Sequence, residues 1–187
     1  MKADEIRALW DAGDMSRCAS AAIEAHGPEV LGWLVVTTGD ASEAEEAFAT
    51  ASEDLWRGLS TFRWECSIRA WLYALSRHAL IRRRKVAAER RERRLPLDEA
   101  SSVVDRVRTR TRPWLRTEVK DVFAELRASL AESERELLVL RVDRDLSWDE
   151  IATVLDEPAP RLRKRFQAIK EKLRAGARDK GLMGEEP

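Results

Sequence analysis

Basic side chains crowd one stretch near the carboxyl end, where they surround a regular row of apolar residues. Leu162, Phe166, Ile169 and Leu173 recur at offsets of 4, 3 and 4, a spacing that places them on one face of a helix. Around this row stand the side chains that could contact a nucleic acid, Arg161, Arg163, Lys164, Arg165 and Gln167. Guanidinium groups pair with phosphates and guanine edges, and a glutamine amide pairs with adenine. The pattern predicts a helix that packs with one face and meets a polyanion with the other.

Two shorter helices are expected before this one. Ser133 with Glu136, and Ser147 with Glu150, have the spacing of a capping box just ahead of apolar residues. Prolines at 158 and 160 then interrupt the helical pattern, which predicts a turn. Three helices with a turn before a basic last helix are typical of a helix-turn-helix DNA-binding unit.

A second group of residues, from 59 to 85, mixes flat rings with cations. Phe62 and Trp64 precede a helical stretch that carries Arg69, Arg77 and His78. Rings beside arginines are suited to separated DNA strands, where bases stack and phosphates pair with guanidinium groups. Most apolar residues of the helical stretch could instead be core, and we expect this for Trp71 and Leu75. Phe62 and Trp64 lie before the helix, and we weigh an exposed base-stacking role for them equally against burial.

The formal net charge is zero, but the charges are sorted along the chain. Residues 1–60 carry 4 basic and 12 acidic side chains, and residues 61–94 carry 11 and 3. The pattern repeats with 10 and 15 over 95–157, and 9 and 4 over 158–187. Since charges in water are screened over about 8 Å, the local excess decides binding, and both basic blocks favour nucleic acid.

The fold class is expected to be all-α, with two small helical domains joined by a flexible linker and the second a helix-turn-helix domain. The expected helices span about 3–12, 15–25, 28–38, 41–58, 66–92, 114–130, 133–144, 147–155 and 160–176. The predicted domains are 1–94 and 114–176, with a linker at 95–113 rich in Ser, Thr, Asp and Arg, and a tail at 177–187.

Other classes of protein find little support in the sequence. It contains no run of about 20 apolar residues that could span a membrane and no signal-peptide pattern at its start, so we expect a soluble, cytoplasmic protein. Cys18 and Cys66 lack the spacing of a zinc site. With two histidines and no glycine-rich phosphate loop, the sequence predicts neither an enzyme nor a bound cofactor or metal.

Both groups of residues, in this order, resemble the extracytoplasmic-function sigma factors of bacterial RNA polymerase. The resemblance covers about 28–174. It is carried by Gly39-Asp40, Ala44-Glu45-Glu46, Leu55-Trp56 and the run 70–77 in the first half, and by 134–136, 146–152 and 162–165 in the second.

The resemblance implies a transcription initiation factor with core RNA polymerase and promoter DNA as partners, and an anti-sigma factor as a further one. It implies polymerase docking by Glu45, Glu46 and Trp56, and melting of the minus-ten element by Phe62, Trp64, Arg69, Arg77 and His78. Arg161, Arg163, Lys164, Arg165 and Gln167 would contact the minus-thirty-five element.

Several positions depart from the family pattern. Glu46, Ala49 and Ser52 replace the usual Asp, Gln and aromatic of the polymerase-contacting helix, and Asp156 replaces the usual glycine of the carboxy-terminal turn. The alternative is a free-standing helix-turn-helix regulator that binds duplex DNA as a dimer. Size separates the two classes, because a free sigma factor is expected to be a monomer.

Overall fold

The computed structural model describes residues 3–93 and 126–179, and within these ranges it contains helices and no strand. The expected all-α class is confirmed. The described helices fall into two compact units, α1–α4 in the first and α6, η3 and α8 in the second together with residues 148–152 of α7. The predicted linker at 95–113 and most of the expected helix at 114–130 lie outside the described residues, where 126–128 are helical.

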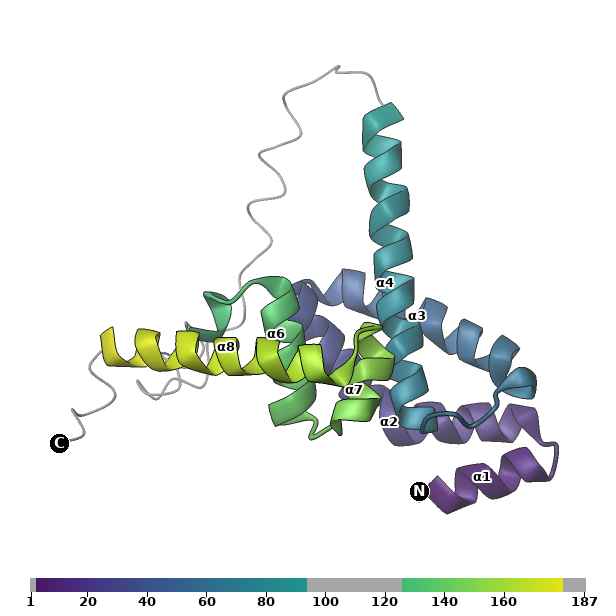
Figure 1. Ribbon diagram of the computed structural model, residues 1–187. Coiled ribbons are helices and arrows are strands. Elements are labelled where there is room, and N and C mark those ends of the chain that lie inside the picture. Colours follow the sequence, from purple (N-terminus) through teal and green to yellow (C-terminus); the bar gives the residue numbers. More distant parts are fainter. Residues whose placement is uncertain (1–2, 94–125, 180–187) are drawn as a thin grey trace, which may run out of the picture. The chain divides into compact units, whose positions relative to one another are not determined.

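The first unit is a packed set of four helices (Figure 1): α1 (Ala3–Asp11), α2 (Met15–Thr38), α3 (Ala41–Gly58) and α4 (Ile68–Arg93). α3 packs against both α2 and α4, and a short helix, η1 (Leu59–Thr61), follows it. Trp33 of α2 meets Tyr73 of α4 edge to face, with ring centroids 5.2 Å apart, and both side chains are fully buried. This core fixes the face of α4 that remains for contacts outside the protein.

The expected break between helices 15–25 and 28–38 is wrong, because α2 runs unbroken through Gly27 and Pro28. A proline inside a helix lacks the N–H that would bond the carbonyl four residues earlier, here that of Glu24. Pro28 and Glu24 are both exposed, so water can satisfy that carbonyl and the helix continues.

The second unit is built from α6 (Glu132–Leu138), η3 (Val139–Asp143), residues 148–152 of α7 (Trp148–Leu155) and α8 (Ala159–Asp179). η3 is a turn of π-helix that continues α6, and the helix expected at 133–144 corresponds to the two together. The buried row that holds the unit together consists of Leu137, Leu140, Leu146, Ile151 and Leu162. α8 ends three residues later than expected, and residues 180–187 of the predicted tail lie outside the described part.

One of the two expected capping boxes is present. The Ser147 hydroxyl accepts from the Glu150 N–H at 3.2 Å, and the Glu150 carboxylate accepts from the Ser147 N–H at 2.9 Å. The box expected at Ser133 and Glu136 is wrong, since α6 begins at Glu132 and it is Glu134 that accepts from the Ala131 N–H at 2.8 Å. Glu136 is buried instead.

Candidate nucleic-acid and polymerase interfaces

α8 presents the basic face that its sequence predicts. Leu162 and Ile169 are buried, while Arg163, Lys164 and Gln167 are exposed. The face begins directly after the turn that joins α7 to α8, where Asp156 has a left-handed backbone with φ 54°. Because α7 and α8 are joined by so short a turn, the exposed side of α8 is held in a fixed relation to α7, as DNA reading by a helix-turn-helix requires.

On α8, two of the arginines predicted to bind DNA are engaged within the protein. The Arg165 guanidinium pairs with the carboxylate of Glu157 and lies 3.4 Å from the Ser133 carbonyl oxygen. Arg161 is largely exposed but also reaches Glu157, at 3.3 Å. The face therefore divides into arginines held by a carboxylate and the three side chains that carry no such pairing among the described contacts, Arg163, Lys164 and Gln167.

Trp148, the first residue of α7, supports the outer part of this face. The Arg163 guanidinium lies 5.8 Å from the centroid of the Trp148 ring, and that of Arg141 lies 5.3 Å from it. Phe166 of α8 meets the same ring edge to face at 5.6 Å. Contacts between a cation and a ring contribute about 0.5–1 kcal/mol at exposed sites, so Trp148 restrains Arg163 without removing it from solvent.

Of the two roles weighed equally for Phe62, the structure favours burial. Its side chain is only 9% exposed, and its ring stacks on Trp71 with centroids 4.3 Å apart and an angle of 12° between the planes. The Trp64 ring lies 5.1 Å from that of Phe62 and is partly buried. The connection between η1 and α4 curls back over Trp71, and its rings share one apolar cluster with the helix.

α1 covers the outer side of this cluster. Trp10 meets the Trp64 ring edge to face at 5.8 Å and donates its indole N–H to the Leu59 carbonyl at 2.9 Å. The Arg7 guanidinium lies 4.6 Å from the centroid of the Trp64 ring. Trp64 itself has a left-handed backbone with φ 59°, which a bulky residue rarely adopts, so its placement is enforced by these contacts.

The remaining predicted residues of the first unit differ in their surroundings. Arg69 makes two hydrogen bonds to the Glu29 carboxylate, at 2.7 and 2.8 Å, and His26 lies 3.3 Å from the same group. Burial raises the pKa of Glu29, but the hydrogen bonds from Arg69 and His26 outweigh it and lower the pKa to about 2. Arg77 is partly exposed and His78 is exposed. The structure thus ties Arg69 to α2 and leaves His78 at the surface.

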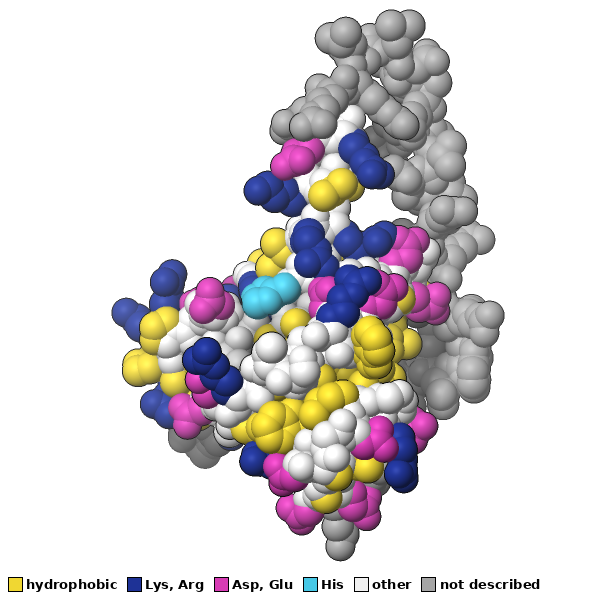
Figure 2. Space-filling view, turned by 90° about the vertical axis from the view of Figure 1, so that its right-hand side faces the viewer, with side chains coloured by type: hydrophobic (Ala, Val, Ile, Leu, Met, Phe, Trp, Pro, Cys, Tyr) yellow, Lys and Arg dark blue, Asp and Glu magenta, His cyan; other side chains and the backbone are white. Residues whose placement is uncertain are grey.

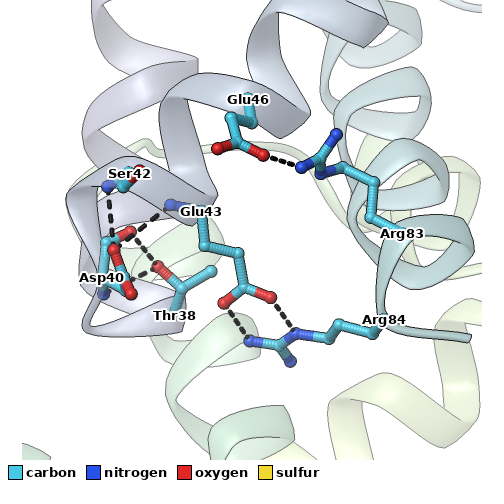
Figure 3. Close-up of polar contacts among 7 residues, drawn as sticks. All are labelled: Thr38, Asp40, Ser42, Glu43, Glu46, Arg83 and Arg84. Carbon is cyan, nitrogen blue, oxygen red and sulfur yellow. Dashed lines mark hydrogen bonds and ion pairs between the residues drawn. The ribbon is translucent and has the colours of Figure 1, made fainter. Parts of the chain in front are cut away.

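The side chains predicted to bind polymerase lie on α3. Trp56 is 59% exposed, and Glu45 is exposed. Glu46 is also at the surface, but it pairs with Arg83 of α4, as Figure 3 shows. Next to it the carboxylate of Glu43 accepts two hydrogen bonds from Arg84, at 2.7 and 2.9 Å (Figure 3). Trp56 and Glu45 therefore remain as the more accessible groups of the predicted set.

A third pair, Asp54 with Arg82 at 2.8 Å, completes a ladder of ion pairs between α3 and α4. We call these three pairs the α3–α4 ladder. Figure 2 shows Lys and Arg side chains along α4, the upright helix of Figure 1, with acidic side chains immediately beside them. The acidic block and the first basic block of the sequence meet here, so much of the basic charge of α4 is balanced inside its own unit.

Sequence reasoning missed Arg7, Trp10 and Glu157, which contact predicted site residues. Arg7 and Trp10 lie one turn apart on α1 and could have been read as one helix face. Glu157 directly precedes Pro158 and lies eight residues before Arg165, and no local spacing rule connects it with Arg165. In the described part of the chain no cluster of histidine, cysteine or acidic side chains could hold a metal ion. None of the described helices is long and apolar enough to cross a membrane.

Comparisons with known proteins point in one direction. Residues 22–90, which include α3 and most of α4, match the sigma-70 region 2 family. The RNA polymerase sigma-H factor of Pseudomonas aeruginosa is 28% identical over 153 residues, which span 76% of this chain and 77% of that protein. The fold is similar to that of the sigma factor RpoE from Bartonella quintana, solved in complex with the anti-sigma factor NepR. The TM-score is 0.64 at 11% identity, with 85% of this chain and 96% of the other covered.

The family match falls on the unit that carries the α3–α4 ladder, and the relative extends over most of the chain. The all-α fold agrees with both. Residues 22–90 therefore match a sigma-70 region 2, and over most of its length the chain is similar to a sigma factor.

Proposed function

We propose that this chain is a sigma factor of the extracytoplasmic-function type, a non-catalytic transcription initiation factor. It would dock on core RNA polymerase with α3 and read promoter DNA with the exposed face of α8. The observation that carries the proposal is the sorting of α8, with Leu162 and Ile169 buried and Arg163, Lys164 and Gln167 exposed beyond a short turn. A helix of this kind fits the major groove, where arginine can pair with guanine and glutamine with adenine.

The first unit would act on the minus-ten element. Arg77 and His78 lie on the partly exposed side of α4, close in sequence to the basic run 82–85. The aromatic cluster of Phe62, Trp64 and Trp71 would support this surface, because its rings are packed against one another. Opening the duplex costs a few kcal/mol for each unstacked base, which favourable contacts to the separated strand offset.

The polymerase contact would centre on Trp56, with Glu45 beside it on α3. A large, exposed aromatic side chain is typical of the residues that dominate protein interfaces. An anti-sigma factor is a further partner in this proposal, since the structurally similar RpoE was solved with one. The work of the protein would then be done in the cytoplasm, where the polymerase transcribes.

Transcription with purified components tests the proposal as a whole. The full chain is added to core RNA polymerase on a library of promoter fragments, and discrete transcripts that depend on the chain are expected. Trp56→Ala should reduce binding to core polymerase at unchanged helix content, with exposed Glu24→Ala as a control outside α3. Core polymerase that starts equally well without the chain would refute the proposal.

The role of α8 has its own test. On the preferred promoter, Arg163→Ala or Gln167→Ala should cost about 1–3 kcal/mol if each contacts a base edge. Lys164→Ala should weaken binding to all duplexes alike. The salt slope, which is the steepness with which log affinity falls with log salt concentration, should decrease by about one, as loss of a phosphate contact predicts. Unchanged DNA binding by a variant with alanine at Arg163, Lys164 and Gln167 together would show that α8 does not contact DNA.

The same α8 could also serve a dimeric regulator that binds duplex DNA alone. Sedimentation of the free chain distinguishes the two functions. A monomer that binds core polymerase supports the sigma role, and a stable dimer with no affinity for polymerase supports the regulator.

A further inference from the structure

Glu157 occupies the turn between α7 and α8, and its carboxylate faces α8. The side chain is 24% exposed and contacts two arginines, Arg165 and Arg161. Arg165 is in addition directed toward the Ser133 carbonyl at the start of α6. One acidic group thus engages two of the five side chains of α8 that the sequence predicts to bind DNA.

A carboxylate in this position changes what the helix does to DNA. Free arginines attract phosphates of any sequence, and each phosphate contact adds about 0.9 to the salt slope of binding. An arginine paired with a carboxylate gives up part of that attraction, and the negative charge itself repels phosphate. The side chains left without such a partner among the described contacts, Arg163, Lys164 and Gln167, include the arginine and glutamine suited to reading base edges.

We propose that Glu157 is a specificity-determining residue of the promoter contact. By holding Arg165 and restraining Arg161, it limits the sequence-independent attraction of α8 and leaves discrimination to Arg163 and Gln167. The proposal rests on the DNA-reading role of α8 proposed above. Glu157 does not contact DNA itself but acts through the two arginines, so it is a positioning residue.

The first measurement is a salt titration of the full chain binding to a random-sequence duplex of about 30 base pairs. Glu157→Gln keeps the shape of the side chain and removes its charge. It should tighten binding about 3–10-fold at low salt and steepen the salt slope by about one to two, because one or two arginines become available to phosphates. Glu171→Gln, which removes an exposed carboxylate from the same helix, is the matched control and should change the slope by less than about half a unit.

A double-mutant comparison then separates release of Arg165 from a general charge effect. Arg165→Gln should lower the salt slope by about one in the Glu157→Gln background and by much less in the wild type. An equal effect in both backgrounds would mean that Arg165 already contacts phosphate, and it would overturn the proposal. Parallel losses of melting temperature and affinity in both single variants, with no change of slope, would show a purely structural role and would overturn it as well.

Specificity itself is measured with core polymerase on the preferred promoter, with random duplex as the competitor. For Glu157→Gln, at least about threefold less random duplex should reduce binding to the promoter by half, as expected when sequence-independent affinity rises. An unchanged requirement contradicts the proposal. If the wild-type chain supports no transcription, the proposed sigma function fails, yet the titration with random duplex still reports whether Glu157 restrains the arginines.

Discussion

Asp156 holds a backbone conformation that glycine adopts more readily. Its φ of 54° and ψ of 43° are left-handed, and it ends α7 with its N–H bonded to the Ala152 carbonyl. A left-handed residue with a Cβ costs about 1–2 kcal/mol, although aspartate tolerates it better than most. The turn of the helix-turn-helix is therefore formed at some expense in stability.

Asp156→Gly should stabilise the second unit by about 0.5–1 kcal/mol, because the strain is relieved at a position that already has φ above zero. Thermal unfolding followed by circular dichroism would show a higher midpoint. Asp149→Gly, in the right-handed first turn of α7, should lower the midpoint instead. A fall for both variants would show that the Asp156 side chain contributes more than the backbone strain costs.

Glu29 makes stability depend on pH in the acid range. Its pKa is about 2 in the folded protein against 4.5 for an ordinary glutamate, so folding favours the charged form. The stabilisation is complete above about pH 4.5 and is lost as the pH falls toward 2. At a side chain that is 25% exposed, solvent screening reduces the contribution to about 1–2 kcal/mol.

Glu29→Gln should therefore lower the free energy of unfolding at pH 7 and flatten its decline between about pH 4.5 and 2. Urea unfolding at a series of pH values measures both effects. Glu24→Gln, an exposed change on the same helix, serves as the control. A pH profile for Glu29→Gln parallel to that of the wild type would show that Glu29 titrates normally.

Phe62 belongs to the core of the first unit, so Phe62→Ala should lower its stability by about 3 kcal/mol. Arg63→Ala, at the exposed neighbouring position, should change it by less than about 0.5 kcal/mol. Denaturant unfolding compares the two variants. Equal stability of Phe62→Ala and the wild type would mean that the ring is free to leave the cluster and would restore its role in base stacking.

At the scale of elements, the α3–α4 ladder joins helices that the core already packs together. Its pairs are partly exposed, so each contributes modestly and more strongly at low salt. Arg84→Gln should cost about 0.5 kcal/mol at low ionic strength, and this loss should shrink in about 1 M salt. Lys85→Gln removes a neighbouring exposed charge and should cost less. A loss for Arg84→Gln that does not vary with salt would point to packing and not to charge.

Helices with strong local signals were predictable from sequence. The expected 41–58 coincides with α3, whose Asp40 cap accepts from Ser42 and Glu43 N–H groups, and 147–155 differs from α7 by one residue. The break at Gly27-Pro28 was not predictable locally, because exposure of the Glu24 carbonyl depends on how α2 packs. The same reason explains Phe62, whose burial depends on Trp71 and on the return path of the loop.

The residue types of the candidate site were predictable from the sequence, but the ion pairs that these residues form within the protein were not. The exposed and buried faces of α8 follow from its periodicity. The pairing of Arg165 with Glu157, and of Arg69 with Glu29, joins residues 8 and 40 positions apart, and sequence spacing cannot specify such contacts. Charge counts located the basic blocks but could not show that the α3–α4 ladder balances part of one.

At the scale of the whole molecule, the predicted two-domain organisation leads to an expectation about the segment at 95–113, which lies outside the described residues. If it is a linker, trypsin at low concentration should cut first after Arg106, Arg108 or Arg110, and both products should remain helical; Arg112 precedes Pro113, so trypsin spares that bond. Mass spectrometry identifies the cuts and circular dichroism the folding. Earlier cuts within 41–58 or 147–155 would contradict the domain boundaries.

The contact of α1 with the aromatic cluster gives the molecule an optical property. Indole emission depends on the polarity around the ring and on nearby charged groups, and Trp10 and Trp64 have the Arg7 guanidinium 5.2 and 4.6 Å from their ring centroids. Any event that lifts α1 from the loop would expose these rings to water and separate them from the cation. The tryptophan spectrum of the free protein can thus report, without a label, when the surface near α4 is rearranged by a partner.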